Sequence, residues 1–585
     1  MLRQRWLGRV PYPEALDLQH ALFEQRRGDH LLLLEHPHVY TIGRSGDPAN
    51  VLVDPESVGA TFERVDRGGD VTYHGPGQLV GYPIIDVPGR RGGGLADTVA
   101  YVRSVEQLII DTLAEFGLTA DRLDRYPGVW LDTDGDRPRK IAAIGVRLTR
   151  GRSMHGFALN VDPALDMFGH IVPCGIADKA VTSMVAEGVH ASMADVVDVV
   201  MRLAAERWGA AGVERQDVTG RPAGDTDLAP FSRGLGPGEL VRPHQHGSSA
   251  TTGPDQHGSS APTGPDQDSS VVTGLSIGKA PSRLERRRAQ AGIEGEIGVR
   301  ERKPDWLRVS ADMGPDFLEL KRTMRQHSLV TVCEEAACPN IFECWNEGTA
   351  TFMINGERCT RACGFCHVDT RKPEPPDPDE PARIADAVTS MRLQHAVITT
   401  VARDDLADHG ARGFVESIEA IRRTSPSTAI EVLISDCRGD TDALGAIFDA
   451  RPDVMNHNLE TVARLQRVVR PSAGYARSLA VLARSKAAGL VTKSGLIVGM
   501  GETDDEVEGA LADLAAVGCD IVTIGQYLRP TTNHLPVHRW VEPATFARYT
   551  ELGRALGIAH VESSPLTRSS HHAGVVAEQV GVTTA

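Results

Sequence analysis

Residues 359–366 read CTRACGFC and place three thiols in the spacing C-x3-C-x2-C. One short loop with this spacing can aim Cys359, Cys363 and Cys366 at a single cubane iron–sulfur cluster, and it supplies no fourth ligand. One iron then stays open, which a catalytic cluster needs and a structural cluster avoids. A zinc site is the alternative, although zinc loops usually pair cysteines as C-x2-C and close four ligands. The stretch therefore predicts a catalytic iron–sulfur cluster.

The remaining cysteines are spread unevenly along the chain. Of nine cysteines, Cys333, Cys338 and Cys344 form a second closely spaced set just before the first loop, and Cys174 stands alone in the N-terminal half. Cys437 and Cys519 lie outside both sets, and we expect them in the hydrophobic core. An odd count with this distribution indicates thiolate and metal chemistry and argues against a disulfide framework.

Outward from the cysteines, short β-rich runs alternate with helical segments. The expected strands are 396–400, 430–435, 454–458, 490–499 and 521–526. Thr503 and Glu506 form the capping-box pattern T-x-x-E directly after one strand and a GMGE loop, so a helix should begin there. Regular alternation of this kind predicts a parallel sheet curled into a full or partial barrel.

Several motifs of this half resemble a known family. The C-x3-C-x2-C loop, with Phe365 before its last cysteine, resembles the radical S-adenosylmethionine superfamily. The second set, within CEEAACPNIFECW, resembles lipoyl synthase, as do VARDDL (401–406), HNLET (457–461), TKSGLIVGMGET (492–503) and QYLRP (526–530). The resemblance covers roughly residues 300–575.

This resemblance implies two [4Fe–4S] clusters and a radical reaction. The cluster on the 359–366 loop would bind S-adenosylmethionine at its open iron, and one electron from a donor protein would cleave it to methionine and a 5′-deoxyadenosyl radical. That radical would remove hydrogens from C6 and C8 of a protein-bound octanoyl chain. The auxiliary cluster on Cys333, Cys338 and Cys344 would supply the two sulfurs. Unactivated C–H bonds are beyond side-chain chemistry, so a cofactor must carry this reaction.

The resemblance also implies further ligands. The family's auxiliary cluster takes a serine from a C-terminal RSSY motif, which reads RSSH at 568–571 here, so the role is carried to Ser570 while His571 replaces the tyrosine. The loop residues Gly499, Gly501 and Glu502, together with Phe365, are expected to contact the cofactor. A GxGE sequence by itself is often only a turn.

Between the two halves, residues 219–282 lose hydrophobic periodicity. QHGSSATTGPD at 245–255 is followed by QHGSSAPTGPD at 256–266. This composition cannot bury enough apolar surface to offset the entropy of ordering, which predicts a flexible linker. We therefore expect an α+β domain at 1–218, a linker at 219–282 and a radical S-adenosylmethionine domain of the partial TIM-barrel type at 283–585.

The N-terminal half reads as mixed α/β. Residues 97–117 are expected to form a helix capped by Asp97 and ended at Gly117, and 141–148 and 154–161 to form paired strands. The segments EHPHVYTIGR (35–44), RGGDVTYHGPGQ (67–78), RKIAAIGVR (139–147), HGFAL (155–159) and HIVPCGI (170–176) are also present. Together they resemble the octanoyl-acyl-carrier-protein:protein octanoyltransferases, which have the biotin/lipoate ligase fold.

In that family the counterparts of Cys174 and Lys140 form the catalytic pair. The segments expected to line the acyl site are Arg67, Gly68, Gly69, Asp70, Val71, Thr72, Tyr73, His74, Ala143, Ile144, Gly145, Gly156, Phe157 and Ala158. His74 is expected to shape or hydrogen-bond the acyl site, and simple packing at a strand end is its alternative.

Elementary chemistry supports the Cys174–Lys140 pairing. A thioester is attacked by thiolate, and an ordinary cysteine is little ionised at neutral pH. A nearby ammonium favours thiolate and can exchange a proton, which an arginine cannot. Only eight of the 62 basic residues are lysine, so lysine at position 140 stands out. The alternative is an ATP-dependent lipoate–protein ligase of the same fold, which needs no acyl-accepting cysteine.

Composition and charge exclude several classes of function. A chain of 585 residues with 41% hydrophobic and 24% charged residues accommodates two to four globular domains. Its net charge of -16 argues against nucleic acid or an anionic membrane as the main partner. The opening MLRQRWLGRVPYPEAL has no apolar signal region and the apolar runs are too short to span a bilayer, so we expect a cytoplasmic protein.

The expected function is therefore a bifunctional lipoylation enzyme. Its partners would be octanoyl-acyl carrier protein, lipoyl carrier domains of 2-oxoacid dehydrogenase E2 subunits and of glycine cleavage H protein, and an electron donor. One alternative is that only one half is catalytic and the other docks carrier domains. A linker spanning roughly 40 Å would allow one carrier to pass between the sites, although the linker can equally be a passive join.

Overall fold

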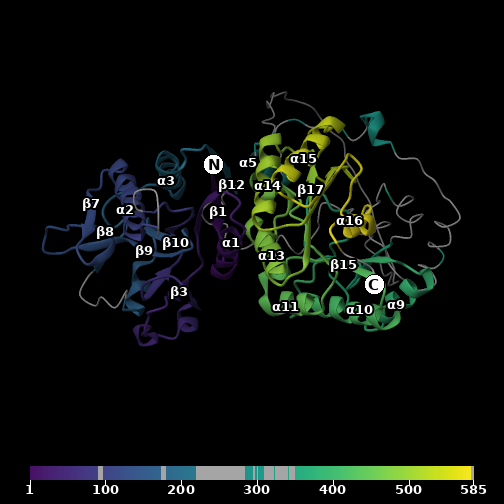
Figure 1. The fold of residues 1–585 in the computed structure, drawn as a ribbon, viewed down its shortest axis with the longest axis horizontal. Coiled ribbons are helices and arrows are strands. Elements are labelled where there is room, and N and C mark those ends of the chain that lie inside the picture. The colour runs from purple at the N-terminus through teal and green to yellow at the C-terminus, as the bar shows by residue number, and fades with distance from the viewer. Residues whose placement is uncertain are drawn as a thin grey trace, which may run out of the picture.

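The structure is a computed structural model. It describes residues 1–89, 96–172, 180–218, 283–290, 292–293, 295, 297–298, 301–308, 322, 340 and 350–581. Figure 1 shows two lobes side by side, with the N-terminal domain at one end and a domain of alternating strands and helices at the other. The expected linker at 219–282 lies outside the described residues.

The N-terminal domain is built on a nine-stranded sheet in the order β12-β1-β2-β6-β10-β9-β8-β7, with β11 paired to β9. Its strands are β1 Leu2–Arg9, β2 Asp29–Glu35, β6 Gln78–Ile84, β7 Ala120–Leu123, β8 Tyr126–Leu131, β9 Arg139–Thr149, β10 Arg152–Asn160, β11 Ala180–Val181 and β12 Val213–Asp217. A smaller sheet has the order β4-β3-β5, with β3 Val39–Ile42, β4 Thr61–Arg64 and β5 Val71–His74. The helices are α1 Tyr12–Gln25, α2 Thr98–Glu115 and α3 Met193–Trp208.

Local sequence signals account for several of these elements. Asp97 caps α2 by accepting a hydrogen bond from Ala100 N at 3.0 Å, as expected, and the helix ends at Glu115, two residues before the expected end. The expected strand pair is β9 and β10, antiparallel, with Arg152 opposite Thr149. Arg150 and Gly151 between them both have positive φ, the backbone geometry that closes a two-residue hairpin.

The C-terminal domain is a seven-stranded, wholly parallel sheet in the chain order β13 to β19. The strands are β13 Ala350–Ile354, β14 His395–Thr400, β15 Ala429–Leu433, β16 Val454–Asn456, β17 Val491–Val498, β18 Ile521–Gln526 and β19 His560–Ser563. The helices are α5 Arg283–Gln290, α9 Glu380–Met391, α10 Ala411–Thr424, α11 Thr441–Asp449, α12 Gln466–Val469, α13 Tyr475–Ala487, α14 Asp504–Ala516, α15 Pro543–Ala555 and α16 Ala573–Gln579. The expected parallel βα architecture is confirmed, with an open sheet that matches a partial barrel.

The expected capping box forms at the start of α14. Thr503 Oγ1 accepts a hydrogen bond from Glu506 N, and the Glu506 carboxylate accepts one from Thr503 N. The cap ends the loop that follows β17 and fixes where α14 begins. Among the described helices, none combines the length and the apolar run needed to cross a membrane.

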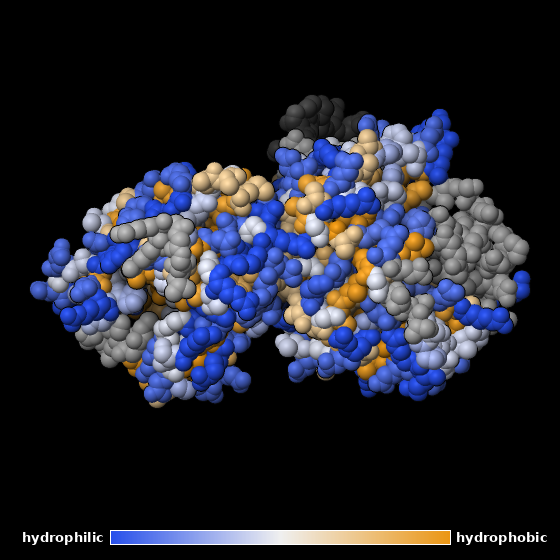
Figure 2. All heavy atoms as spheres, in the orientation of Figure 1, coloured by the Kyte–Doolittle hydropathy of each residue, from blue (hydrophilic) through white to orange (hydrophobic). Residues whose placement is uncertain are grey.

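The two domains pack directly against each other, which the sequence did not lead us to expect. Helix α1 lies along α13, and one hydrophobic cluster contains side chains from both domains, among them Leu18 and Leu22 of α1 and Leu479 of α13. Figure 2 shows the two lobes meeting at a waist. A cavity of about 20 Å³ lies at this contact, lined from both domains by residues that include Leu18, Leu22 and Leu479.

Charged side chains complete the interface. Arg5 of β1 is 2% exposed, and its guanidinium bonds both carboxylate oxygens of Asp513 on α14, at 3.0 and 2.8 Å. Arg477 and Arg484 of α13 pair with Glu14 and Asp17 of α1. Because buried charges cost free energy unless they are paired, these contacts favour one docked arrangement.

Candidate active sites

The CTRACGFC loop follows β13, at the carboxyl edge of the parallel sheet, where sites of open α/β folds are built. Its backbone is held on both sides. Cys359 N donates to Asp369 O at 2.8 Å, Gly364 N donates to Val469 O at 2.8 Å, and Leu535 N donates to Gly364 O at 2.9 Å. The loop is therefore fixed by three distant segments of the domain.

The three thiols of this loop fit an iron–sulfur cluster. The five cysteines that the structure describes are all free, and Arg361 N donates to Cys359 Sγ at 3.4 Å. Burial raises the pKa of Cys359, raises that of Cys363 to about 12, and raises that of Cys366 as well. An iron ligand must be a thiolate, and bound metal stabilises that form against the cost of burial.

Arg361 inside the loop is anchored by a buried charge network. Its guanidinium lies 2.7 Å from Asp404 and 2.6 Å from Asp436, a carboxylate with no exposed side-chain surface. Asp404 belongs to the VARDDL motif, so the network explains why that motif accompanies the cysteine loop. Asp436 carried no signal in the sequence, because a single aspartate after a strand is common.

The C-terminal segment is brought against the same region. Asn458 Nδ2 donates to Ser569 Oγ at 2.7 Å and to Glu460 Oε1 at 3.0 Å. Asn340, which lies between Cys338 and Cys344 in the sequence, donates to Leu566 O at 2.7 Å and is 3% exposed. Cys333, Cys338 and Cys344 themselves are outside the described residues, so their clustering stays a prediction.

Ser570 is partly buried beside an unexpected set of side chains. His571 stacks on His572 with ring centroids 3.8 Å apart, and potential metal-ligating atoms of these two residues and Glu562 lie within 4.8 Å of one another. Glu562 also lies 3.5 Å from His560. The substitution of the family's tyrosine by His571 is therefore accommodated in a histidine–carboxylate cluster.

The loop Gly499–Thr503 contains two glycines with positive φ. Gly499 and Gly501 have φ of 103° and 118°, which side chains with a Cβ rarely adopt. Glu502 is 3% exposed and accepts hydrogen bonds from Gly499 N and Met500 N. Phe365 packs against the hydrophobic cluster that contains Met500. The role of these residues in cofactor contact stays a prediction.

Sequence reasoning missed a buried ion pair within the sheet. Lys493 Nζ lies 2.9 Å from Glu431, both side chains are 1% exposed, and Asn456 donates to Glu431 at 2.9 Å. Although burial opposes ionisation, the Lys493 ammonium lowers the pKa of Glu431 to about 2. Lys493 is in the TKSGLIVGMGET motif, but only the fold shows that its partner lies two strands away, on β15.

In the N-terminal domain, Arg67 organises the glycine-rich segment. Its guanidinium donates to Thr41 O and Thr41 Oγ1, each at 2.8 Å, and its side chain crosses Gly145. A Cβ on Gly145 would lie 3.1 Å from Arg67 Cδ, so this close approach favours glycine. Gly68 N donates to Val146 O. The 67–74 and 143–145 segments thus lie side by side, and their role in lining an acyl site stays a prediction.

The other expected acyl-site segment lies beside them. Gly156, Phe157 and Ala158 on β10 pair in register with Gly145, Ile144 and Ala143 on β9. The segment 71–74 forms β5, whose four residues are all buried. Asp70 has a different role, because its carboxylate accepts hydrogen bonds from Asp47 N and Asn50 Nδ2 in a neighbouring turn.

A hydrogen-bond chain connects His74 with the lysine strand. His74 Nδ1 donates to Gln78 Oε1 at 2.8 Å, and Gln78 Nε2 donates to Asn160 Oδ1 at 2.9 Å. Asn160 then donates to Thr182 O, and Thr182 N donates to Lys140 O. Burial, with the nearby charges of His36 and Arg67, lowers the pKa of His74 well below its ordinary value. A neutral hydrogen-bonding role fits this setting better than that of a charged group.

Lys140 lies at the beginning of β9 and is 8% exposed. Its ammonium lies 4.8 Å from the centre of the Trp130 ring, and Val181 of β11 is its register partner. Cys174 lies outside the described residues. The chain leaves the described part at Val172 and returns at β11 beside Lys140, so the flanking segments are compatible with the expected pair.

Aromatic residues missed by the sequence reasoning border His74. Tyr12 of α1 stacks on His74 with ring centroids 6.0 Å apart, and His36 meets it edge-on at 5.7 Å. Tyr82 OH lies 2.8 Å from His36 Nε2. His36 is in the EHPHVYTIGR motif, which could have signalled it, whereas Tyr12 and Tyr82 have no local signature.

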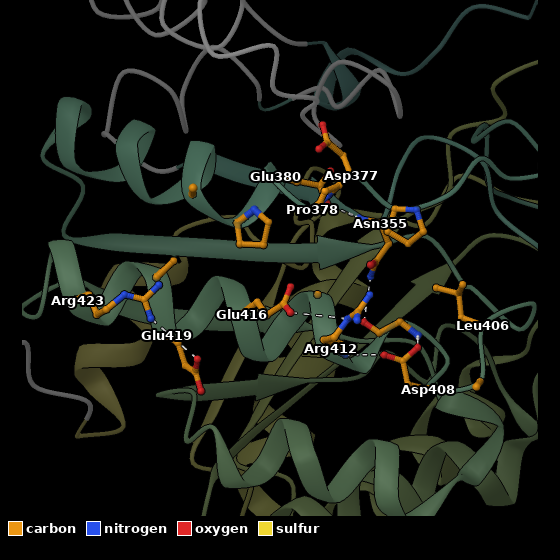
Figure 3. A pocket seen from close by; sticks show the side chains of 17 residues that line it. Asn355, Asp377, Pro378, Glu380, Leu406, Asp408, Arg412, Glu416, Glu419 and Arg423 are labelled. Carbon is orange, nitrogen blue, oxygen red and sulfur yellow. Dashed lines mark hydrogen bonds and ion pairs between the residues drawn. The ribbon is translucent and has the colours of Figure 1, made fainter.

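A separate hollow of about 730 Å³ lies on the flank of the C-terminal domain, between α9 and α10 (Figure 3). Glu416 and Glu419 along it are paired with Arg412 and Arg423 of the same helix. Asn355 at its end donates to Thr400 Oγ1 and Gly410 O. None of the expected site residues lines it. The hollow and the two candidate active sites therefore lie in different places.

Comparisons with known proteins find family matches in both halves of the chain, one of which begins at residue 248, inside the expected linker. The family described as lipoyl protein ligase A/B catalytic domain matches residues 11–204, the radical SAM superfamily matches 353–514, and the N-terminal domain of lipoyl synthase matches 248–338. Lipoyl synthase of Mycobacterium ulcerans is 52% identical over 302 residues, which are 52% of this chain and 91% of that protein. Lipoyl synthase of Nocardia farcinica is 51% identical over 297 residues, 51% of this chain and 82% of that protein.

Among solved structures, a bipartite lipoate protein ligase from Thermoplasma acidophilum is 18% identical, with a TM-score of 0.32. The match covers 38% of this chain and 88% of that one.

Proposed function

This chain belongs to the lipoyl synthase family and carries a lipoyl protein ligase A/B catalytic domain ahead of the synthase, which makes it a bifunctional lipoylation enzyme; we propose that it performs two consecutive steps on the same carrier. The first is transfer of octanoate from acyl carrier protein to a lysine of a lipoyl carrier domain. The second is insertion of sulfur at C6 and C8 of that octanoyl group. The observation that carries the proposal is the presence of both cysteine sets and the Lys140 strand in one chain.

In the first step, Cys174 thiolate attacks the carbonyl of the octanoyl thioester. A bond forms between the cysteine sulfur and the acyl carbon, and the carrier's phosphopantetheine thiol leaves with a proton that Lys140 can supply. The amine of the target lysine then attacks the acyl-cysteine, an amide forms, the Cys174 thiolate leaves, and Lys140, neutral after the first step, takes the proton that the amine loses. The Lys140 ammonium lies 4.8 Å from the centre of the Trp130 ring, and the residue is largely shielded from water, which suits a positioned group that exchanges a proton with the substrate.

The residues around His74 would position the acyl chain. The buried aromatic rings of Tyr12 and Tyr82 would provide apolar surface beside His74 and His36. His74, held by Gln78, would orient the thioester by a hydrogen bond without carrying charge. This arrangement favours a linear, apolar acyl group over a polar one.

In the second step, Cys359, Cys363 and Cys366 would hold the cluster that binds S-adenosylmethionine, and Cys333, Cys338, Cys344 and Ser570 would hold the auxiliary cluster. These groups supply the radical chemistry and the two sulfur atoms when bound. Gly499, Gly501, Glu502 and Phe365 would shape the cofactor pocket. Contacts from Asn340 to Leu566 and from Asn458 to Ser569 support bringing the second set to the 569–570 segment.

The test of the whole proposal is a reconstitution with the full chain. Iron, sulfide, S-adenosylmethionine and a reductant are supplied under anaerobic conditions, with octanoyl-acyl carrier protein and apo lipoyl domain. Intact mass should show one octanoyl group added, followed by two sulfurs replacing two hydrogens. A carrier that gains octanoate and never sulfur would remove the second half of the proposal.

A second candidate for the first half is an ATP-dependent ligase acting on the free acid, which the matched ligase family also allows. The two are separated by a Cys174→Ala variant assayed with octanoyl-acyl carrier protein and, in parallel, with octanoate and ATP. Loss of transfer from the carrier protein supports the acyl-enzyme. Retained transfer, or transfer that needs ATP, supports the ligase.

Ser570→Ala is expected to separate the two radical-domain reactions. S-adenosylmethionine cleavage should continue, because the 359–366 cluster is intact, while sulfur insertion should fall about 10–100-fold because the auxiliary cluster loses a ligand. The products are counted as 5′-deoxyadenosine and lipoyl carrier in the same reaction. Ser425→Ala, at a partly buried serine that follows the last residue of α10, is the matched control. Sulfur insertion at the parent rate in Ser570→Ala would remove Ser570 from the ligand set.

A further inference from the structure

The contact between the domains reaches the helix that carries the candidate cofactor loop. Gln216 of β12 donates its side-chain amide to the carbonyls of Asp505 and Glu506 at 3.2 and 3.3 Å. Both carbonyls lie in the first turn of α14. A Cβ on Gly509, one turn further, would lie 1.6 Å from Gln216 Nε2. Glycine in a helix interior is unfavourable, so the close approach of β12 explains its presence.

The same first turn holds the Gly499–Thr503 loop. Arg464 lies 2.6 Å from Glu506 and also donates to Gly501 O at 2.8 Å. Glu506 in turn bonds Thr503 N in the capping box. A displacement of the start of α14 would therefore disturb both the cap and the carbonyl of Gly501.

The rest of the interface holds α13 and α14 together from one side. Asp513, in the last turn of α14, accepts from Arg5 and also from Tyr475 OH of α13 at 2.9 Å. Arg5 further pairs with Glu214 of β12 at 2.8 Å. One buried guanidinium from the N-terminal domain thus bridges β12, α13 and α14.

We propose that the N-terminal domain is a structural support for the synthase: by docking on α13 and α14 it holds the loop Gly499–Thr503 in the conformation that binds S-adenosylmethionine. The inference rests on the proposed function only in assigning that loop to the cofactor. The N-terminal domain then has two roles, acyl transfer and support of α14. Gln216 and Arg5 are positioning residues in this proposal, because they act through α14.

The experiment begins with the full chain carrying a specific protease site within residues 240–260. After reconstitution and cleavage, native mass spectrometry should find the two halves still associated one to one at micromolar concentration. Glu14→Arg/Asp17→Arg places two arginines against Arg477 and Arg484, so the cleaved variant should separate. Glu24→Arg reverses a charge on the same helix at an exposed position that pairs within its own domain, with Arg150, and is the matched control.

Two readouts then test the loop. S-adenosylmethionine binding to the cluster-loaded protein should weaken about tenfold when the halves separate, within the usual range for coupled sites. Amide hydrogen exchange at residues 499–507, measured without S-adenosylmethionine, should accelerate. Cleaved parent and Glu24→Arg proteins should match the intact chain in both.

Because separation itself can unfold the C-terminal half, a third variant tests the loop in the intact chain. In the intact chain, Gln216→Ala removes only the contact to α14 and should accelerate exchange at 499–507 while the sheet strands keep their protection. Unchanged exchange in this loop, both in Gln216→Ala and after separation, would overturn the proposal. The exchange readout needs no sulfur insertion, so its failure is distinct from failure of the proposed reaction.

Discussion

A Cys363→Ala variant of the full chain is expected to lose S-adenosylmethionine cleavage and to hold about four irons where the parent holds about eight, because each [4Fe–4S] cluster contributes four. The loop that carries Cys363 is fixed by backbone bonds to Asp369 and Val469, and its neighbours Cys359 and Cys366 cannot replace the missing thiolate. The measurements are iron and labile sulfide per chain and 5′-deoxyadenosine under reduction. Octanoyl transfer by the N-terminal domain should be unchanged.

The matched control is Cys437→Ala. Cys437 is 2% exposed, as Cys519 is, and both are buried as the sequence predicted for cysteines outside the two sets. Its removal should leave iron content and cleavage at the parent level. Equal iron loss in the two variants, or eight irons retained in Cys363→Ala, would contradict the assignment of the 359–366 loop.

The second large effect is expected at Lys140. Lys140→Ala should slow octanoyl transfer from acyl carrier protein by about 10²–10⁴-fold, the usual contribution of a positioned acid–base group. Lys140→Arg keeps the positive charge but cannot exchange a proton at neutral pH, so it should recover little of the rate. Single-turnover transfer to apo lipoyl domain, followed by intact mass, measures both variants.

Lys486→Arg serves as the control for this pair of variants. Lys486 is partly exposed and pairs with Asp520 at 2.6 Å, far along the chain from the transfer site, and arginine can keep that ion pair. Transfer should proceed at the parent rate. Should Lys140→Arg also match the parent, charge alone would be sufficient and the proton-exchange role would be wrong.

The fold of each domain could be read from local patterns to a large extent. Strands β14 and β18 were expected because short runs of β-branched residues fill strands that are buried on both faces. The start of α14 was expected because Thr503 and Glu506 satisfy each other's backbone donors within one turn. These signals depend only on neighbours in sequence, so they can be recognised without knowledge of the rest of the chain.

The contacts missed by sequence reasoning join residues far apart. Arg5 and Asp513 are 508 residues apart in sequence, and neither position differs locally from an ordinary surface charge. The pair Lys493–Glu431 spans three adjacent strands, and only the sheet order brings it together. The link from His74 to Thr182 depends on Gln78 and Asn160, which lie on adjacent strands paired in register. Each of these contacts can be recognised only once the order of the strands and helices is known.

The docked face of the N-terminal domain also has a consequence for how this protein is made. Leu18 and Leu22 of α1 belong to the hydrophobic cluster that α13 completes. During synthesis the first 218 residues are complete well before α14 ends at Ala516, which at ordinary elongation rates is a delay of roughly 15–60 s. Throughout that interval this face of the nascent chain lacks its partner, so its yield should depend on chaperones that shield such surfaces on the ribosome.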